Sequence, residues 1–335
     1  MNKIIIIGNG FDLAHGLKTS YKDLMEFIIE DANPIGIKEG NCGVKHYPNS
    51  NFIAFKQKPR QLGNTEYEFT SCPKHSSIFF KELFNHYNKY EKWIDLESLY
   101  YRLLRKNLSL PENIDILNRE FDHLKNLLQK YLKEKVENPL PDFNRDFRDC
   151  IFENTEIDEK ILGIINFNYT KKTVAYHLQF AKYKSNFYHE NFQLINIHGD
   201  LNNSLNPIIF GYGDDNSEEY NKIQNLEKDY LLKNFKTFQY LQTSNYHRLL
   251  SLLEVEKNIN IEIIGHSCGL TDKTLLKTIF QHPNIKKIEY RYHGGEQNYF
   301  NNIYNISRIF DDNVLMRKKL INLTLTRKVP RYNLL

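Results

Sequence analysis

Four consecutive isoleucines, Ile4–Ile7, end abruptly at Gly8-Asn9-Gly10, and this junction constrains the fold more than any other feature of the chain. β-Branched residues that are apolar on both faces are typical of a strand buried on both sides of a parallel sheet. After the glycines, Ser20 is a candidate N-cap for an amphipathic helix over Tyr21–Glu30. The stretch therefore predicts a strand, a glycine turn and a helix, the arrangement at which α/β folds bind nucleotides.

The second half of the chain returns to an alternation of strands and helices. Its predicted strands lie in ILGIINFNYT (161–170), FQLINIHGD (192–200), PIIFGYGD (207–214), INIEIIGHS (259–267) and IKKIEYRYH (285–293), and a helix is predicted over Thr173–Tyr183. This order favours an α/β fold with an open, mostly parallel sheet and helices on both faces.

An insertion separates the first strand from the others. Residues 31–77 are rich in proline and glycine, which predicts an irregular segment with a short hairpin around Asn51–Phe55. Residues 78–136 place apolar side chains three and four apart, as helices do. The predicted organisation is a first βα unit (1–30), an irregular insertion (31–77), a helical insertion or subdomain (78–150) and the remainder of the α/β domain (151–335).

Composition narrows the class of protein. The chain has 335 residues, of which 41% are hydrophobic, and no apolar run is long enough to cross a bilayer, so we expect no membrane association. No secretory signal pattern opens the sequence, and the four cysteines are few and scattered, which favours a cytoplasmic location. A net charge of +4 gives only weak support for nucleic-acid binding.

The predicted strands end in polar or glycine residues that could carry chemistry. These endings are Gly8-Asn9-Gly10 with Asp12, Asn166–Thr170, His198-Gly199-Asp200, Gly211–Asp214 and Gly265-His266-Ser267. Each ending alone has a structural explanation, because glycine stops a strand and Asn or Asp caps a helix. A common sheet would bring all of them to one edge, where ligands of open α/β sheets bind.

Two further patterns suggest other chemistry. The stretch Gly265–Gly269 matches the Gly-x-Ser-x-Gly elbow of serine hydrolases, but the histidines downstream, His282 and His293, lack a suitable acid before them, since Asp272 is explained as a helix cap. In the irregular insertion, two cysteines and two histidines form a candidate zinc set of uncommon spacing: Cys42, His46, Cys72 and His75. The spacing of GNGFDLAHG also departs from the Gly-x-Gly-x-x-Gly fingerprint of dinucleotide-binding dehydrogenases.

Taken together, the motifs resemble the phage abortive-infection AbiH family over nearly the whole chain. They are IIIIGNGFDLAHGLKTSYKDL, WIDLE (93–97), INFNYT, INIHGDLNN, IIFGYGD and IIGHSCGLTDKTL. More distantly, their order resembles sirtuin-like NAD-consuming domains, which carry Gly-x-Gly, Thr-Asn-Tyr-Asp, His-Gly and Gly-x-Ser followed by an acid. Two positions depart from that pattern: Asp12 stands near a usual serine, and Thr170 replaces the acid after Asn-Tyr. The resemblance implies a Rossmann-like fold.

The resemblance also implies roles for individual residues. His198 would take a proton from a ribose hydroxyl or a water, and Asn168 would hold that group by its amide. Backbone N–H groups of Gly8, Asn9 and Gly10 would cradle a pyrophosphate, and Ser267 would meet the adenosine ribose. The other residues implied at the nucleotide are Asp12, Tyr169, Gly199, Gly265 and Asp272.

The sequence thus favours an antiphage effector that hydrolyses NAD, its substrate, or a related nucleotide at the N-glycosidic bond without a metal. A nucleotide-binding sensor without turnover and a serine hydrolase stay open as alternatives. A third is a magnesium-dependent nuclease built from acids such as Asp12, Asp95, Glu97, Asp200 and Asp214. Asp95 and Glu97 are second-rank site candidates because they diverge on a predicted helix. Besides the nucleotide, we leave open as partners a phage-derived trigger, a second copy of the chain and nucleic acid.

Overall fold

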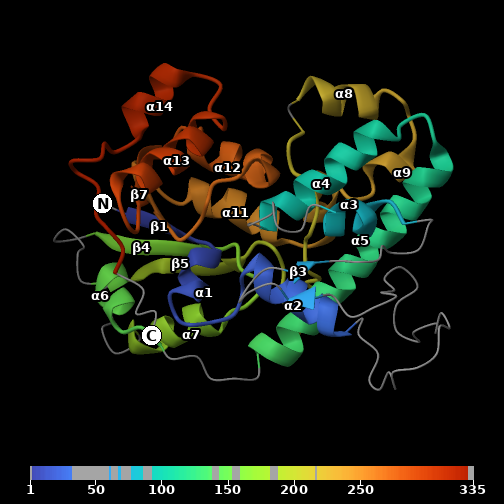
Figure 1. The fold of residues 1–335 in the computed structure, drawn as a ribbon. Helices are drawn as coiled ribbons and strands as arrows, with labels where there is room; N and C mark the ends of the chain where they lie inside the picture. Colours follow the sequence, from blue (N-terminus) through green and yellow to red (C-terminus); the bar gives the residue numbers. More distant parts are fainter. Residues whose placement is uncertain are drawn as a thin grey trace.

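The structure, a computed structural model, describes residues 2–31, 60–61, 67–68, 77–85, 93–137, 143–152, 159–181, 188–215 and 217–330. Its centre is a sheet of five parallel strands: β1 (Asn2–Ile7), β4 (Lys160–Asn166), β5 (Tyr188–Asn196), β6 (Ile259–Ile264) and β7 (Ile285–Arg291). The strand order is β5-β4-β1-β6-β7 (Figure 1). The predicted open α/β sheet is therefore confirmed, and so is the prediction that the strands ending before Gly8, Asn168, His198 and Gly265 are parallel neighbours.

Strand order places a topological switch point beside β1. The chain adds β4 and β5 on one side of β1, and it later adds β6 and β7 on the other side. The segments that follow β1 and β6 lead to helices on opposite faces of the sheet, and at such a point Rossmann-like folds form a ligand crevice.

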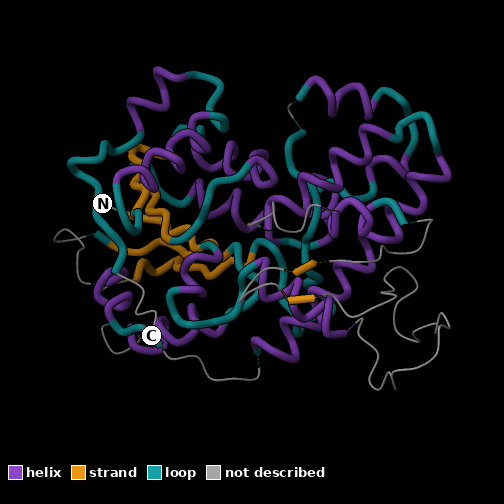
Figure 2. The backbone as a smooth tube through the Cα atoms, in the orientation of Figure 1, coloured by secondary structure: helices purple, strands orange, loops and turns teal. Residues whose placement is uncertain are grey.

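Helices cover both faces of this sheet, as Figure 2 shows. Ile4 and Ile6 of β1 point to the face covered by α11 (Asn245–Glu254), α12 (Lys273–Phe280) and α13 (Glu296–Ser307). Ile5 and Ile7 point to the opposite face, against α1 (Asn9–Leu13), α6 (Asp146–Phe152) and α7 (Lys172–Ala181). Because alternate side chains of one strand enter two cores, all four isoleucines are fully buried.

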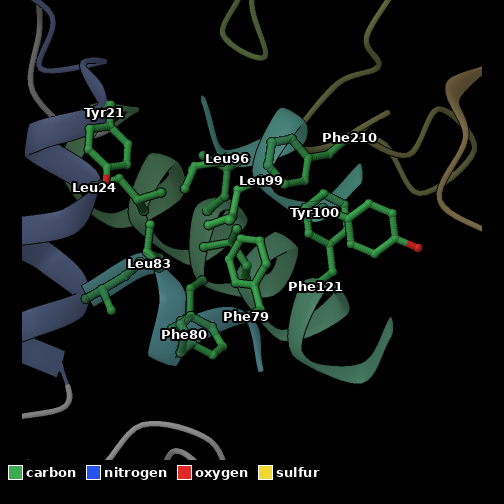
Figure 3. Close-up of a cluster of buried hydrophobic side chains, with 14 of the residues drawn as sticks. Tyr21, Leu24, Phe79, Phe80, Leu83, Leu96, Leu99, Tyr100, Phe121 and Phe210 are labelled. Atoms are coloured by element: carbon green, nitrogen blue, oxygen red, sulfur yellow. The ribbon is translucent and has the colours of Figure 1, made fainter. Parts of the chain in front are cut away.

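A separate apolar core joins the helix of the predicted first βα unit to the helices of the insertion. It joins α2 (Tyr21–Asp31), α3 (Phe79–Asn85), α4 (Trp93–Lys106), α5 (Pro111–Tyr131) and the π-helical turn η2 (Leu132–Val136). Figure 3 shows its centre, where Phe79, Leu99 and Phe121 lie among side chains from α2, α3, α4 and α5. Two further helices, α8 (Glu218–Gln224) and α9 (Asp229–Leu232), contribute to the same core. We call all of these elements together the helical module.

The boundaries of the insertion differ from the predicted ones in detail. Residue 150, where the helical subdomain was predicted to end, lies inside α6, and α6 packs on the sheet through Phe147 and Ile151. In the irregular segment, β2 (Arg60–Gln61) pairs antiparallel with β3 (Tyr67–Glu68). The hairpin predicted around Asn51–Phe55 lies outside the described residues.

The predicted strand at 207–214 is wrong. Tyr212 of this segment pairs with residues 234–236 instead of with a strand of the sheet: its N–H donates to Asn234 O at 3.1 Å, and the Lys236 N–H donates to Tyr212 O at 2.9 Å. A Cβ on Gly211 would lie 2.2 Å from Asn234 O. The glycine thus serves close packing of two chain segments, which an apolar run with glycines does not distinguish from a strand ending.

Two local predictions at the start of the chain have different outcomes. Ser20 does cap α2: its hydroxyl accepts the Asp23 N–H at 3.2 Å, and the Asp23 carboxylate accepts the Ser20 N–H at 2.8 Å, which makes a reciprocal capping box. The glycine turn, by contrast, is helical, since α1 begins at Asn9 directly after Gly8.

Short elements complete the fold. They are α10 (Lys236–Gln239), the 3₁₀ turns η3 (Tyr240–Gln242) and η4 (Leu270–Asp272), and α14 (Asn313–Lys319). Of the helices in the described part of the chain, none combines the length and apolar composition needed to cross a bilayer.

Candidate functional site

A cavity of about 880 Å³ opens at the carboxyl edge of the sheet, a volume within the range of ligand pockets. It is lined by the segments that follow β1, β4, β5, β6 and β7, and by Glu97 of α4 in the helical module. The sequence-predicted residues in its wall are Asn9, Gly10, Asp12, Asn168, Tyr169, His198, Gly265, Ser267 and Asp272, together with Glu97. The structure therefore brings most of the predicted site together.

The glycines of the β1 and β6 loops let the two loops pack against each other. A Cβ on Gly8 would lie 2.6 Å from the His266 Cα, and one on Gly265 would lie 2.4 Å from the Phe11 nitrogen. The Gly8 N–H donates to Ile264 O at 3.1 Å, and the Gly10 N–H donates to Gly265 O at 2.8 Å. Both N–H groups are thus used within the protein, so the prediction that they cradle a pyrophosphate is wrong for these two residues.

His198 lies at the floor of the cavity and is held as one tautomer. Its Nδ1 is 3.0 Å from Phe167 O, and because a carbonyl oxygen only accepts, this nitrogen carries the proton. Nε2 is left as the acceptor of a neutral ring, 3.3 Å from the Tyr240 hydroxyl and 3.2 Å from Asp272 Oδ1. Burial, followed by the charge of Lys236, lowers the pKa of His198, while Asp272 opposes this change. The ring is therefore neutral near pH 7.

A buried row of charges lies beside His198. Lys236 Nζ is 2.7 Å from Asp272 Oδ1 and 3.0 Å from Glu97 Oε1, and the lysine is 1% exposed. Burial alone would raise the pKa of Asp272, but Lys236 and His198 hold it well below its usual range. Burial raises the pKa of Glu97, and Lys236 opposes that rise. Asp272 precedes α12 yet makes no side-chain cap, so its interpretation as a helix cap is wrong.

His266 contacts the same carboxylate from the opposite side. Its Nδ1 accepts the Cys268 N–H at 3.0 Å, so the ring proton of a neutral His266 is on Nε2, which lies 3.6 Å from Asp272 Oδ2. The ring also packs edge-on against Phe167, with 4.3 Å between centroids. Asp272 is consequently surrounded by one ammonium and two imidazoles.

A second polar cluster surrounds Asp12, which is 1% exposed. Thr170 donates its hydroxyl to Oδ2, and Thr173 donates its hydroxyl to Oδ1 at 2.5 Å. Burial raises the pKa of Asp12 to about 6, although these hydrogen bonds act in the opposite direction. The cavity therefore contains a carboxyl group that titrates close to neutral pH.

Asp12→Asn is expected to remove a pH dependence of stability. The folded state holds the Asp12 pKa at about 6 instead of 3.8, so burying the ionised carboxylate opposes folding above both values and does not do so below them. Stability of the native chain should therefore fall by about 3 kcal/mol as the pH rises through this interval. Thermal melts should show the variant more stable by several degrees at about pH 7.5 and similar to the native chain at about pH 4. Equal differences at both pH values would contradict this assignment.

Other predicted residues serve the scaffold of the site. The Asn168 amide donates to Gly8 O at 3.2 Å, and the Asn9 amide donates to Thr19 O at 2.9 Å. The Tyr169 hydroxyl donates to Ile209 O at 3.1 Å. Gly199, which was implied at the nucleotide, has φ +88° and does not line the cavity; a Cβ there would lie 2.2 Å from Pro207 O, so the glycine serves close backbone packing.

The geometry after β6 is not that of a nucleophile elbow. Positive φ angles occur at Gly265 and Cys268, on either side of Ser267, and α12 begins only at Lys273. Within the described residues, Ser267 is exposed and its hydroxyl makes no hydrogen bond to a histidine, while its carbonyl accepts the Asn305 amide at 2.9 Å. The arrangement does not support a serine hydrolase.

The acids considered for a magnesium site do not converge. Asp200 pairs with Lys171 at 2.7 Å and Asp214 pairs with Lys273 at 3.3 Å, and neither lines the cavity. In the part of the chain that the structure describes, no three His, Cys, Asp or Glu side chains are grouped as metal ligands. The Asp95 side chain lies outside the described residues. The candidate zinc ligands Cys42, His46, Cys72 and His75 lie outside them as well.

The sequence did not predict Lys236 as a site residue, and it did not predict the contact of His266 with Asp272. Lys236 lies in KNFKTFQ, where a lysine in a short polar helix is expected to be exposed, and no local pattern distinguishes it. His266 was predicted at one of the strand endings that meet at a common edge, but the sequence assigned it no individual role. Thr173 begins a predicted helix, and its contact with Asp12 connects segments 161 residues apart.

The fold defines a Rossmann-like α/β protein with a large cavity at its topological switch point. The family model described as "Bacteriophage abortive infection AbiH" matches residues 4–293, so the chain belongs to the AbiH family, as its motifs suggested. Membership implies a role in abortive infection by phage. No curated protein and no solved structure matches the chain significantly.

Proposed function

We propose that this chain is an abortive-infection effector that hydrolyses NAD, or a related nucleotide, at the bond between nicotinamide and ribose. The observation that carries the proposal is His198: a neutral imidazole, with Nδ1 committed to Phe167 O, presents Nε2 as a proton acceptor in the cavity wall. General-base groups of this kind work best when they are neutral near the operating pH.

The proposed reaction needs only positioned protein groups. The bond between ribose C1′ and the nicotinamide nitrogen breaks, and its electron pair neutralises the pyridinium ring. A water oxygen bonds to C1′, and its proton passes to His198 Nε2 and then to solvent. Asp272 Oδ1, 3.2 Å from Nε2, accepts a hydrogen bond from the imidazolium that forms.

Charge at the cavity floor suits such a reaction. Glu97 and Asp272 are two carboxylates balanced by the single ammonium of Lys236, which leaves one net negative charge when all three are ionised. A negative field stabilises the oxocarbenium-like centre that develops at C1′. The two departures from the sirtuin-like pattern, Asp12 and Thr170, hydrogen-bond to each other, so they act as one pair in the cavity wall.

A nucleotide sensor without turnover is the second candidate. It is favoured by the engagement of the Asn168 amide with Gly8 O, because this amide was expected to hold the reacting hydroxyl or water. The same cavity would then recognise the ligand without reacting with it.

Nicotinamide release separates these functions. The purified chain is incubated with NAD, and NAD is also measured over time in cells that express the chain and resist a phage. We expect loss of NAD with equimolar nicotinamide and ADP-ribose, at least in the infected cells. Saturable NAD binding without loss would favour the sensor. Phage resistance with constant NAD and cleavage of DNA or RNA in magnesium would overturn both in favour of a nuclease.

A further inference from the structure

One buried ammonium connects the helical module to the floor of the cavity. Lys236 belongs to α10, and Glu97 belongs to α4 of the helical module. Asp272 directly precedes α12, a helix that packs on the sheet. Lys236 Nζ lies 3.0 Å from Glu97 Oε1 and 2.7 Å from Asp272 Oδ1. Glu97 is itself held by the Gly211 N–H at 3.1 Å. The three charges thus form a continuous bridge that ends at His198.

Stability alone does not account for such a bridge. Moving an ammonium and two carboxylates out of water is costly, and apolar replacements of buried ion pairs are often as stable or more stable. What the bridge supplies is geometry, because Lys236 binds the same Asp272 oxygen that lies 3.2 Å from His198 Nε2. Any displacement of the lysine therefore moves or frees the carboxylate that faces the imidazole.

We propose that Lys236 is a positioning residue for His198, and that it makes the alignment of the site depend on how α4 of the helical module is docked. Lys236 fixes the Asp272 carboxylate against Nε2, and Glu97 fixes Lys236. A trigger that displaces α4 would act on His198 through this bridge without entering the cavity. The inference rests on the proposed role of His198, but its test does not require turnover.

The charges around His198 predict that two substitutions, Lys236→Met and Glu97→Gln, shift its pKa in opposite directions. The groups that face the ring are Asp272, Lys236, His266, and the hydroxyl-bearing rings of Tyr240 and Tyr169. Replacing Lys236 by methionine removes a positive charge and leaves Asp272 unneutralised, so the imidazolium is favoured. Replacing Glu97 by glutamine leaves Lys236 paired with Asp272 alone, so the imidazolium is disfavoured.

The test is an NMR titration of histidine side chains in the full chain without ligand, with the His198 signal assigned by its loss in His198→Asn. Lys236→Met should raise the pKa of His198 by about one unit or more, and Glu97→Gln should lower it. Lys233→Met is the matched control, because Lys233 lies three residues away in an exposed pair with Asp122 at 2.7 Å. It should leave the titration unchanged.

Shifts of opposite sign in the two variants support the inference, because general loosening of the fold would move both in one direction. An unchanged His198 titration in a folded Lys236→Met chain overturns it. If Lys236→Met does not fold, Glu97→Gln decides, since its amide still accepts the Gly211 N–H: a lowered pKa supports the bridge, and an unchanged pKa overturns it. Failure of NAD hydrolysis in the native chain would remove the proposed function and leave this titration valid.

Discussion

His198→Asn is expected to lower NAD turnover about 10²-fold to 10⁴-fold, the usual range for a positioned acid–base group, while the protein stays folded. The asparagine amide nitrogen occupies a position close to that of imidazole Nδ1, so the variant keeps a donor for Phe167 O and loses only the acceptor at Nε2. The chemical role of His198 is thereby separated from its structural role.

Turnover of the His198→Asn chain is measured as nicotinamide release, beside a thermal melt and an NAD-binding isotherm. Affinity should change little, because the imidazole acts mainly in the transition state. His198→Ala serves as a comparison: it also loses the donor to Phe167 O, so it should melt at a lower temperature with the same loss of turnover. Full activity in a folded His198→Asn chain would remove the proposed mechanism.

Gly265→Ala is expected to destabilise the protein by about 2–5 kcal/mol, because the added methyl group meets both a backbone penalty and a steric one. A positive φ costs a non-glycine residue about 1–2 kcal/mol, and a forced close contact adds about 1–3 kcal/mol. Gly265 has φ +69°, and its Cβ would lie 2.4 Å from the Phe11 nitrogen at the packed β1 and β6 loops.

Gly294→Ala is the matched control for this substitution. Gly294 has the same φ of +69° in the loop after β7, but nothing lies within 4 Å of an added Cβ. It should lose only about 1–2 kcal/mol. The difference between the two midpoints in denaturant melts isolates the packing of the loops. Equal losses would contradict the conclusion that Gly265 is required by the close approach of Phe11.

The strands were predictable because strand formation depends on the local pattern of apolar residues. Ile4–Ile7 are apolar on both faces, and this is the pattern that a central parallel strand requires, so β1 and its parallel neighbours followed from the sequence. The segment 207–214 shows that a local pattern does not specify sheet pairing. It has the same apolar run ending in glycine, but its hydrogen-bond partners lie at Asn234 and Lys236, and local composition does not specify partners.

At the candidate site, the sequence likewise predicted the residues but not their hydrogen-bond partners. Asp12, Asn168 and His198 were identified because each follows a strand that ends at a common edge, and Asp272 was identified from the resemblance to sirtuin-like domains; all four line the cavity. Their hydrogen-bond partners were not identified. Gly8 and Gly10 were assigned to a phosphate, whereas their N–H groups donate to the end of β6 and to the loop after it. These bonds depend on how closely the two backbones approach, which only packing sets.

The sequence by itself determined the α/β class, the strand endings that meet at one edge, and the family. These depend on periodicity and on glycine and polar residues at fixed offsets, which are short-range properties of the chain. The tertiary structure alone decided that Lys236 is buried between Glu97 and Asp272, and that Thr173 serves Asp12. A lysine or threonine acquires such a role only when segments distant in the sequence are packed together, because removal from water then makes each charge and hydroxyl depend on its new neighbours.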